Sequence, residues 1–361
     1  MSAAGSARWP WIWPLVAWVV IGIALGTSYG AWPLLVVALV AVVLAAVHHA
    51  EVIAERIGEP FGTLVLAVAV TIIEVALIVS LMLAETEPNM QLPRDTVFAA
   101  VMIIITGMVG LCLLTGGVRH GENTFGELGV SSALVTLAAL SILTMVLPNH
   151  TTTAPGAAYS ASQLAFVALV SLVLYGAFIF VQTVKHRDYF LDATHEQIVA
   201  ATEQHAAVAT RASMHATLLA LLVSLAAVVL LAKSLAPTLT AALDAIGAPD
   251  AATGVFIAAI VLLPESLAAY RAAALNRLQT SLNLALGSAL ASIGLTIPVV
   301  AALSLAMGWT LELGLGSRET VLLLLGLFVC SLSLAKGRTM VLHGVVHLVL
   351  FAVYLFTTIV P

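Results

Sequence analysis

Charged residues are scarce in this chain, because only 9% of its 361 residues are Asp, Glu, Lys or Arg. A soluble domain carries roughly 25% charged residues, so a soluble protein is excluded. Hydrophobic residues make up 61% of the chain, and the mean hydropathy is +1.12. This composition indicates a polytopic membrane protein whose main partner is the lipid bilayer. It leaves the oligomeric state open.

Cysteine and basic residues are also sparse. Cys112 and Cys330 are the two cysteines, and each lies inside an apolar run. Without a Cys-x-x-Cys pair, neither a disulfide framework nor a thiolate metal site is expected. The net charge is −5 and no basic stripe is present, which excludes nucleic acid as a partner. The sequence has no His-Glu-x-x-His motif, so an intramembrane enzyme is not expected, nor is a resident cofactor.

Long apolar runs dominate what remains. A transmembrane helix needs about 20 predominantly apolar residues, and eleven such runs can be read along the chain. The sequence therefore predicts an all-α membrane protein. The predicted spans are residues 11–28, 31–50, 61–84, 96–116, 128–148, 159–184, 214–235, 252–275, 281–307, 319–335 and 340–360.

The distribution of Lys and Arg residues tests the predicted number of spans and indicates on which side of the membrane the N-terminus lies. With eleven spans, ten of the 13 Lys and Arg residues fall on the side of the N-terminus, and three (Arg94, Lys233 and Arg318) fall opposite. Cytoplasmic loops carry an excess of Lys and Arg. The N-terminus is therefore predicted to be cytoplasmic, and an odd number of spans places the C-terminus outside.

The one sizeable hydrophilic stretch divides the chain into halves. Residues 185–213 contain no Pro or Gly and predict a cytoplasmic linker helix. Residues 1–30 form a leading helix, and residues 31–184 and 214–361 then hold five spans each. Because five is odd, the second half must enter the membrane from the opposite face. This is the inverted-topology repeat of many secondary transporters.

Two glutamates lie in the middle of apolar runs. Glu74 follows Gly62 by twelve residues, roughly 18 Å along a helix, and Glu265 follows Gly254 by eleven, roughly 16 Å. Both depths fall near the middle of a hydrocarbon core about 30 Å thick. An ionisable residue at bilayer depth is a functional-site hypothesis by default. Two of them, one in each half, predict a cation and proton site.

The charge balance suggests how such a site would work. Two ionised glutamates with one Ca²⁺ are neutral, and the same two glutamates are neutral when protonated. With either ion bound, the neutral site could pass through the alternating-access cycle. An empty site with two bare carboxylates would be disfavoured. Ca²⁺ is therefore expected to exchange for protons.

Calcium takes six to eight oxygen ligands, so the two glutamates alone cannot complete its coordination. Hydroxyls at Thr106, Ser288 and Ser292 are candidates, because they follow the two glutamates in the next span of each half. Carbonyls freed at helix breaks are others, and the breaks are expected at Gly62, Pro264, Gly287 and Gly294.

Three stretches carry a family resemblance. They read GEPFGTLVLAVAVTIIEVALIVSLML, TFGELGVSSALVTLAALSILTMVLP and PESLAAYRAAALNRLQTSLNLALGSALASIGLTIPVV. They resemble the cation exchanger branch of the calcium/cation antiporters, and bacterial ChaA-like calcium/proton antiporters in particular. The resemblance implies one leading helix plus two inverted five-helix repeats, Ca²⁺ export driven by protons across a bacterial inner membrane, and cation binding by Glu74 and Glu265.

The chain departs from that family at three points. The family has an Asn three residues before each glutamate, where this chain has Thr71 and Leu262. The family's Gly-Ser-Ser-x-Gln begins here at Gly287 but ends in Ala291, so Ser288 or Ser292 is expected to replace the glutamine. These changes leave Na⁺/H⁺ or K⁺/H⁺ exchange through the same site as the alternative function.

Two weaker features have ordinary explanations. Asp95 lies in an outer loop, where a charge is usually only solvated. His343 and His347 lie four residues apart near the C-terminus, a spacing that could bind Zn²⁺, but no third ligand is evident. Structural histidines are the favoured interpretation.

Overall fold

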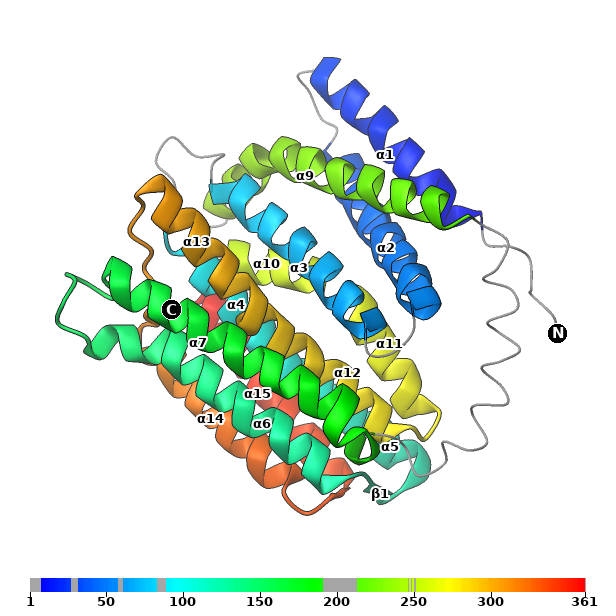
Figure 1. Cartoon of the computed structure of the whole chain (residues 1–361), viewed down its shortest axis with the longest axis vertical. Coiled ribbons are helices and arrows are strands. Elements are labelled where there is room, and N and C mark those ends of the chain that lie inside the picture. The colour runs from blue at the N-terminus through cyan, green and yellow to red at the C-terminus, as the bar shows by residue number, and fades with distance from the viewer. Residues whose placement is uncertain are drawn as a thin grey trace. The chain divides into compact units, whose positions relative to one another are not determined.

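The computed structural model describes residues 8–26, 32–57, 61–82, 89–190, 213–245, 247, 249 and 251–360. Within these ranges the chain is almost entirely helical (Figure 1). The helices are α1 Trp9–Gly26, α2 Trp32–Ile57, α3 Phe61–Met82, α4 Leu92–Met102, α5 Val109–His120, α6 Glu127–Ser141, α7 Ala161–Phe180, α9 Met214–Ala245, α10 Ala251–Val261, α11 Leu263–Ala274, α12 Leu278–Ala291, α13 Ile297–Met307, α14 Ser317–Leu334 and α15 Val341–Ile359. A two-residue antiparallel ladder joins β1 Asn123–Thr124 to β2 Arg338–Thr339.

The described helices occupy the predicted membrane spans. Eight helical segments are long and apolar enough to cross a membrane, and a ninth arises if the bent pair α10–α11 counts as one. Shorter apolar helices at Trp9–Ala24 and Ala67–Met82 belong to α1 and α3. Together these segments lie at the eleven predicted places, which confirms the all-α membrane class.

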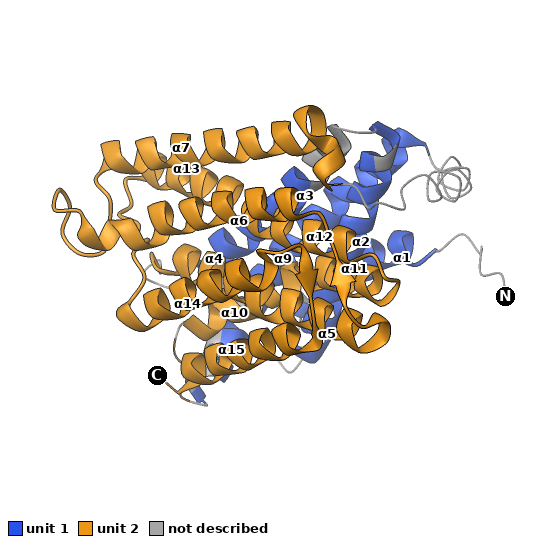
Figure 2. Ribbon diagram, turned by 90° about the horizontal axis from the view of Figure 1, so that it is seen from below, with its two compact units in different colours: residues 1–88, 196–246 blue, residues 89–195, 247–361 orange. Residues whose placement is uncertain are grey.

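The chain forms two compact units (Figure 2). Among the described helices, the first unit holds α1, α2, α3 and α9, and the second holds α4 to α7 and α10 to α15. In the first unit, α2 packs against α1, α3 and α9. In the second unit, α6 packs against α7, α12 and α14 (Figure 1). Each unit takes helices from both predicted repeats, and the repeat boundaries stay a prediction.

Apolar side chains cover the outer faces of the second unit. Phe166 on α7, Phe328 on α14 and Phe356 on α15 are each more than 60% exposed. A soluble protein rarely leaves such large apolar side chains open over several helices. These faces are suited to contact with lipid.

In the described part of the chain, four spans contain a π-helical segment: Ile103–Met108, Ile142–Val146, Val181–Lys185 and Ser292–Thr296. In a π-helical turn each backbone N–H donates to the carbonyl five residues earlier, instead of four. Such turns occur often at functional sites. Inside a membrane, carbonyls that lose their backbone donor must find another. The carbonyl of Leu143 accepts from the hydroxyl of Tyr159 at 2.6 Å, and the carbonyl of Ile105 accepts from His347.

Tyr159→Phe is expected to lower the free energy of unfolding by about 1 kcal/mol, because the Leu143 carbonyl loses its donor. Burial raises the pKa of Tyr159 to about 12, so the donor is present at neutral pH. The stabilisation is complete below the ordinary tyrosine pKa of about 10 and is lost as pH rises through the folded value. Thermal unfolding in detergent measures it. Tyr189→Phe, at an exposed side chain, is the control, and equal loss in both variants would contradict the assignment.

The expected helix breaks are only partly right. Gly62 is the second residue of α3, and α12 continues through Gly287 without a break. The other two expected positions coincide with irregular turns: one lies at Leu262, two residues before Pro264, and the other at Ser292–Thr296, which contains Gly294. A glycine keeps its N–H and can stay in the helical bond pattern, whereas a proline cannot donate.

The linker prediction falls mostly outside the described residues. Lys185 ends a π-helical segment, and Arg187–Phe190 form one 3₁₀ turn. Residues 191–212 lie outside the described ranges. A linker helix over 185–213 therefore stays a prediction.

Candidate cation site

Glu74 lies on α3 in the first unit and is 2% exposed. Thr71, one helical turn earlier, is also buried, and its hydroxyl donates to the carbonyl of Ala67 at 2.8 Å. Residues three apart on a helix are neighbours on its surface. Because the Thr71 hydroxyl gives its proton to the helix, its oxygen keeps lone pairs that could face a cation beside Glu74.

Glu265 lies in the second unit at a sharp bend. The chain turns by 56° between α10 and α11 at Leu262, and Glu265 is the third residue of α11. Pro264 has no N–H, so the carbonyl of Ile260 loses its ordinary helical donor. The positive end of a helix dipole favours a carboxylate in the first turn. The bend thus removes the usual helical donor of the Ile260 carbonyl and places Glu265 in the first turn of α11.

The predicted hydroxyl groups lie on elements around α11. Helix α11 packs against α12, which carries Ser288, and against the π-helical segment that carries Thr106. Ser292 begins the π-helical segment after α12. Thr106 and Ser292 are buried, Ser288 is half-buried, and the Thr106 hydroxyl donates to the carbonyl of Met102. The second unit therefore gathers one glutamate and the oxygen-bearing spans around it. Glu74 and Thr71 belong to the other unit.

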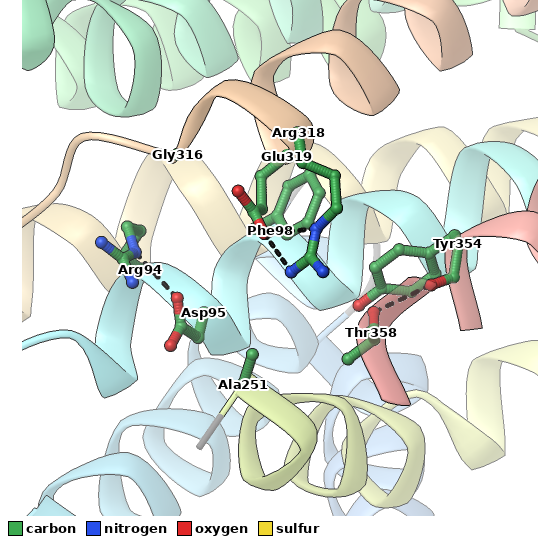
Figure 3. Close-up of a pocket in the computed structure, with 9 residues that line it drawn as sticks. All are labelled: Arg94, Asp95, Phe98, Ala251, Gly316, Arg318, Glu319, Tyr354 and Thr358. Atoms are coloured by element: carbon green, nitrogen blue, oxygen red, sulfur yellow. Dashed lines mark hydrogen bonds and ion pairs between the residues drawn. The ribbon is translucent and has the colours of Figure 1, made fainter. Parts of the chain in front are cut away.

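A second polar region was missed by sequence reasoning. At the ends of α4, α14 and α15, two ion pairs of adjacent residues line a cavity of about 170 Å³ (Figure 3). Arg94 Nε lies 2.7 Å from Asp95 Oδ1, and Arg318 pairs with Glu319. The cavity is lined by Arg94, Asp95, Phe98, Ala251, Gly316, Arg318, Glu319, Tyr354 and Thr358.

Asp95 is therefore not a solvated loop charge, because it is only 8% exposed and is paired. The Arg94 guanidinium also donates to the carbonyl of Gly314 at 3.0 Å, which ties α4 to the loop before α14. The signal was present in the sequence as an Arg followed by an acid at the start of two spans, Arg94–Asp95 and Arg318–Glu319.

A comparison of the whole chain with known protein families gives one match. The family model described as sodium/calcium exchanger protein matches residues 27–184 and 216–360, which is most of the chain. The chain belongs to this family. The chain is therefore a multi-pass membrane protein of an ion-transport family and not of an enzyme family.

Two bacterial relatives are similar to this chain over most of its length. "Putative ionic transporter y4hA" of Sinorhizobium fredii (strain NBRC 101917 / NGR234) is 47% identical over 358 residues, covering 98% of this chain and 96% of the relative. "Sodium-potassium/proton antiporter ChaA" of Escherichia coli (strain K12) is 36% identical over 314 residues, covering 86% and 84%. The predicted resemblance to ChaA-like antiporters is confirmed at the level of the family.

Solved structures confirm the fold of this chain. The selenium-substituted Ca²⁺/H⁺ antiporter protein YfkE superposes with a TM-score of 0.72 at 15% identity, covering 97% of this chain and 100% of that one. The H⁺/Ca²⁺ exchanger CAX superposes with a TM-score of 0.70 at 12% identity, covering 97% and 89%. At these identities the likeness shows the fold alone.

Proposed function

We propose that this protein moves cytoplasmic Ca²⁺ outward in exchange for external protons across a bacterial inner membrane, with Glu74 and Glu265 binding either Ca²⁺ or protons. The observation that carries this proposal is the placement of one glutamate within an apolar span of each half of the chain. A charged residue at the bilayer centre costs about 2.5–3.5 kcal/mol or more, so such residues are rare outside functional sites.

Coupling between Ca²⁺ and proton movement would follow from the requirement that the occupied site be electrically neutral. Ca²⁺ on two ionised glutamates is neutral, and so are two protonated glutamates. A site without ions would leave two bare carboxylates in a medium of low dielectric, a state that is strongly disfavoured. The protein would therefore change its exposed face only when loaded, which makes exchange obligatory.

Local structure supports these roles for the two carboxylates. Glu265 lies in the first turn of α11, where the positive end of the helix dipole is oriented to stabilise its charge when a cation is bound. Thr71 beside Glu74, together with Thr106, Ser288 and Ser292, could supply further oxygens, as Ca²⁺ requires. The Ile260 carbonyl at the bend could add another.

A monovalent alternative uses the same site. The relative that is 36% identical is named a sodium-potassium/proton antiporter. This chain also lacks the glutamine that its wider family places after Gly287, where Ala291 stands. A site with fewer coordinating side-chain oxygens favours a monovalent cation over Ca²⁺, which needs six to eight oxygen ligands. Na⁺ or K⁺ is therefore the second candidate.

Vesicle assays separate the two functions. Everted membrane vesicles with an acid interior would receive Ca²⁺, Na⁺ or K⁺ separately, and a pH-sensitive dye would report proton release. Dequenching by Ca²⁺, absent from vesicles that lack the protein, is the expected result. A response to Na⁺ or K⁺ alone would assign the monovalent function, and no response to any of the three would refute cation/proton exchange by this chain.

A further inference from the structure

His347 on α15 is a buried imidazole for which the proposed exchange has no role. The side chain is 0% exposed, and its Nδ1 lies 2.6 Å from the carbonyl oxygen of Ile105. Gly110 lies directly beneath it, since a Cβ at that position would come within 2.8 Å of the His347 Cβ. The ring is thus held against the middle of the fourth predicted span.

The contact falls on the π-helical segment Ile103–Met108. There the Val109 N–H bonds the carbonyl of Ile104, five residues back, instead of the usual partner four residues back. A shift of this kind leaves carbonyls without their usual donor, and in a membrane a neighbouring side chain must supply one. A carbonyl can only accept, so Nδ1 of His347 carries the proton in this bond. That fixes the tautomer.

The second ring nitrogen of His347, Nε2, has a hydrogen-bond partner that suits both the neutral and the charged imidazole. His347 Nε2 lies 3.2 Å from the hydroxyl oxygen of Ser333 on α14. A hydroxyl both donates and accepts. In the neutral ring Ser333 donates to Nε2, and in the charged ring Nε2 donates to Ser333. The imidazole can therefore take a proton from the aqueous phase onto Nε2 while both hydrogen bonds remain.

The surroundings contain few competing charges. The helices and segments packed against α15 are α5, α10, α14 and the π-helical segment. Their titratable residues, with His343 and Tyr354 on α15 itself, are Cys112, Arg119 and His120 on α5, and Arg318, Glu319 and Cys330 on α14. The four charged or basic residues of α5 and α14 lie at helix ends, and His343 is occupied by a contact of 3.1 Å with Thr339 Oγ1.

The π-helical segment links His347 to the candidate site. It carries Thr106, the residue after Ile105, and it packs against α11, which carries Glu265. Protonation of His347 reverses the bond to Ser333 and places a charge beside this segment. The effect on exchange would pass through the segment, so His347 is a positioning residue.

We propose that His347 is a proton-binding group in the membrane core that holds the π-helical segment Ile103–Met108 in place and makes exchange depend on its own protonation. The proposal rests on the proposed cation/proton exchange for its effect on transport. The binding of the proton itself can be tested without transport.

The decisive variant is His347→Asn. An asparagine amide N–H can take the place of Nδ1–H toward Ile105, but it cannot titrate. The matched control is His343→Asn, one turn away on the same helix. Thermal unfolding of purified protein in detergent would be followed between about pH 5 and 8, where histidine titrates. Stability falls with pH only while the unfolded chain binds a proton that the folded ring does not. If folded His347 binds a proton, the difference between wild type and His347→Asn should therefore level off within this range, whereas a difference that keeps growing down to about pH 5 would show a ring that stays neutral and would overturn the proposal.

Transport gives the second measurement. In vesicles, the pH profile of exchange by His347→Asn should have its midpoint moved by at least half a pH unit, while that of His343→Asn should superimpose on wild type. Ser333→Ala should move the midpoint by about one pH unit toward acid, because the charged ring loses the acceptor for its Nε2–H.

The outcomes separate the two proposals. If stability and exchange of His347→Asn follow wild type at every pH, the role of His347 is refuted. If the stability difference levels off as the folded ring takes up its proton but wild type moves no cation, the proton site stands and the proposed exchange fails. If His347→Asn is unfolded at every pH, the Ser333→Ala profile decides, and a profile equal to wild type would overturn the proposal.

Discussion

Glu265→Gln is expected to abolish cation-evoked proton movement in everted vesicles, with a loss of at least about 100-fold. Glutamine keeps the size and hydrogen-bonding capacity of the side chain but can neither bind a proton at neutral pH nor offset the charge of a cation. Glu74→Gln is expected to have the same effect, because the neutral loaded state requires both carboxylates.

Controls separate this loss from misfolding. Glu127→Gln makes the same chemical change at an exposed first-turn residue of α6, and it should exchange like wild type. Glu265→Asp keeps the carboxylate but sets it back by one methylene, so reduced exchange with altered cation affinity is expected. Retained exchange in either glutamine variant, at normal expression, would exclude the two-carboxylate mechanism.

Gly344→Ala is expected to have the second large effect, a loss of folded protein. An added Cβ at position 344 would lie 2.4 Å from the backbone nitrogen of Leu114 and 2.9 Å from the carbonyl oxygen of Gly110. Both are backbone atoms of α5, so no side chain can rotate away. Overpacking of this kind costs about 1–3 kcal/mol and occasionally more, and here the upper end is expected because α15 must separate from α5.

Gly176→Ala on α7 is the matched control, because nothing lies within 4 Å of a Cβ at that position. Alanine favours a helix over glycine by about 1 kcal/mol, so this variant should be as stable as wild type or slightly more so. Fluorescence-detected size-exclusion chromatography after heating would compare the two. Equal thermal stability of both variants would show that α5 and α15 are not closely packed.

The positions of the spans could be predicted from the sequence because bilayer thickness fixes the length of an apolar run. Burial of Glu74 was also predictable, since a single carboxylate interrupts such a run. Membership of the exchanger family followed from three motifs around the same residues.

Only some of the irregular turns could be placed from local sequence. Gly287 was expected to break its helix, but the π-helical turn begins at Ser292 instead. A π-helical turn depends on donors that arrive from distant segments, as His347 does at Ile105. Residue 347 lies 242 positions away from its partner, and no local pattern encodes such a pair. The buried Asp95 pair was missed for a related reason, because loops and span ends look alike in composition.

The glycines between α5 and α15 have a mechanical consequence. Gly110, Gly117 and Gly344 bring the two backbones so close that a Cβ on any of them would lie within 3 Å of the opposing helix. A sliding step of one residue would press side chains into backbone, so the two helices can move only as one body. Any change that opens the ion path to one side of the membrane and closes it to the other must therefore occur at looser contacts, and α15 travels with the second half of the fourth span throughout.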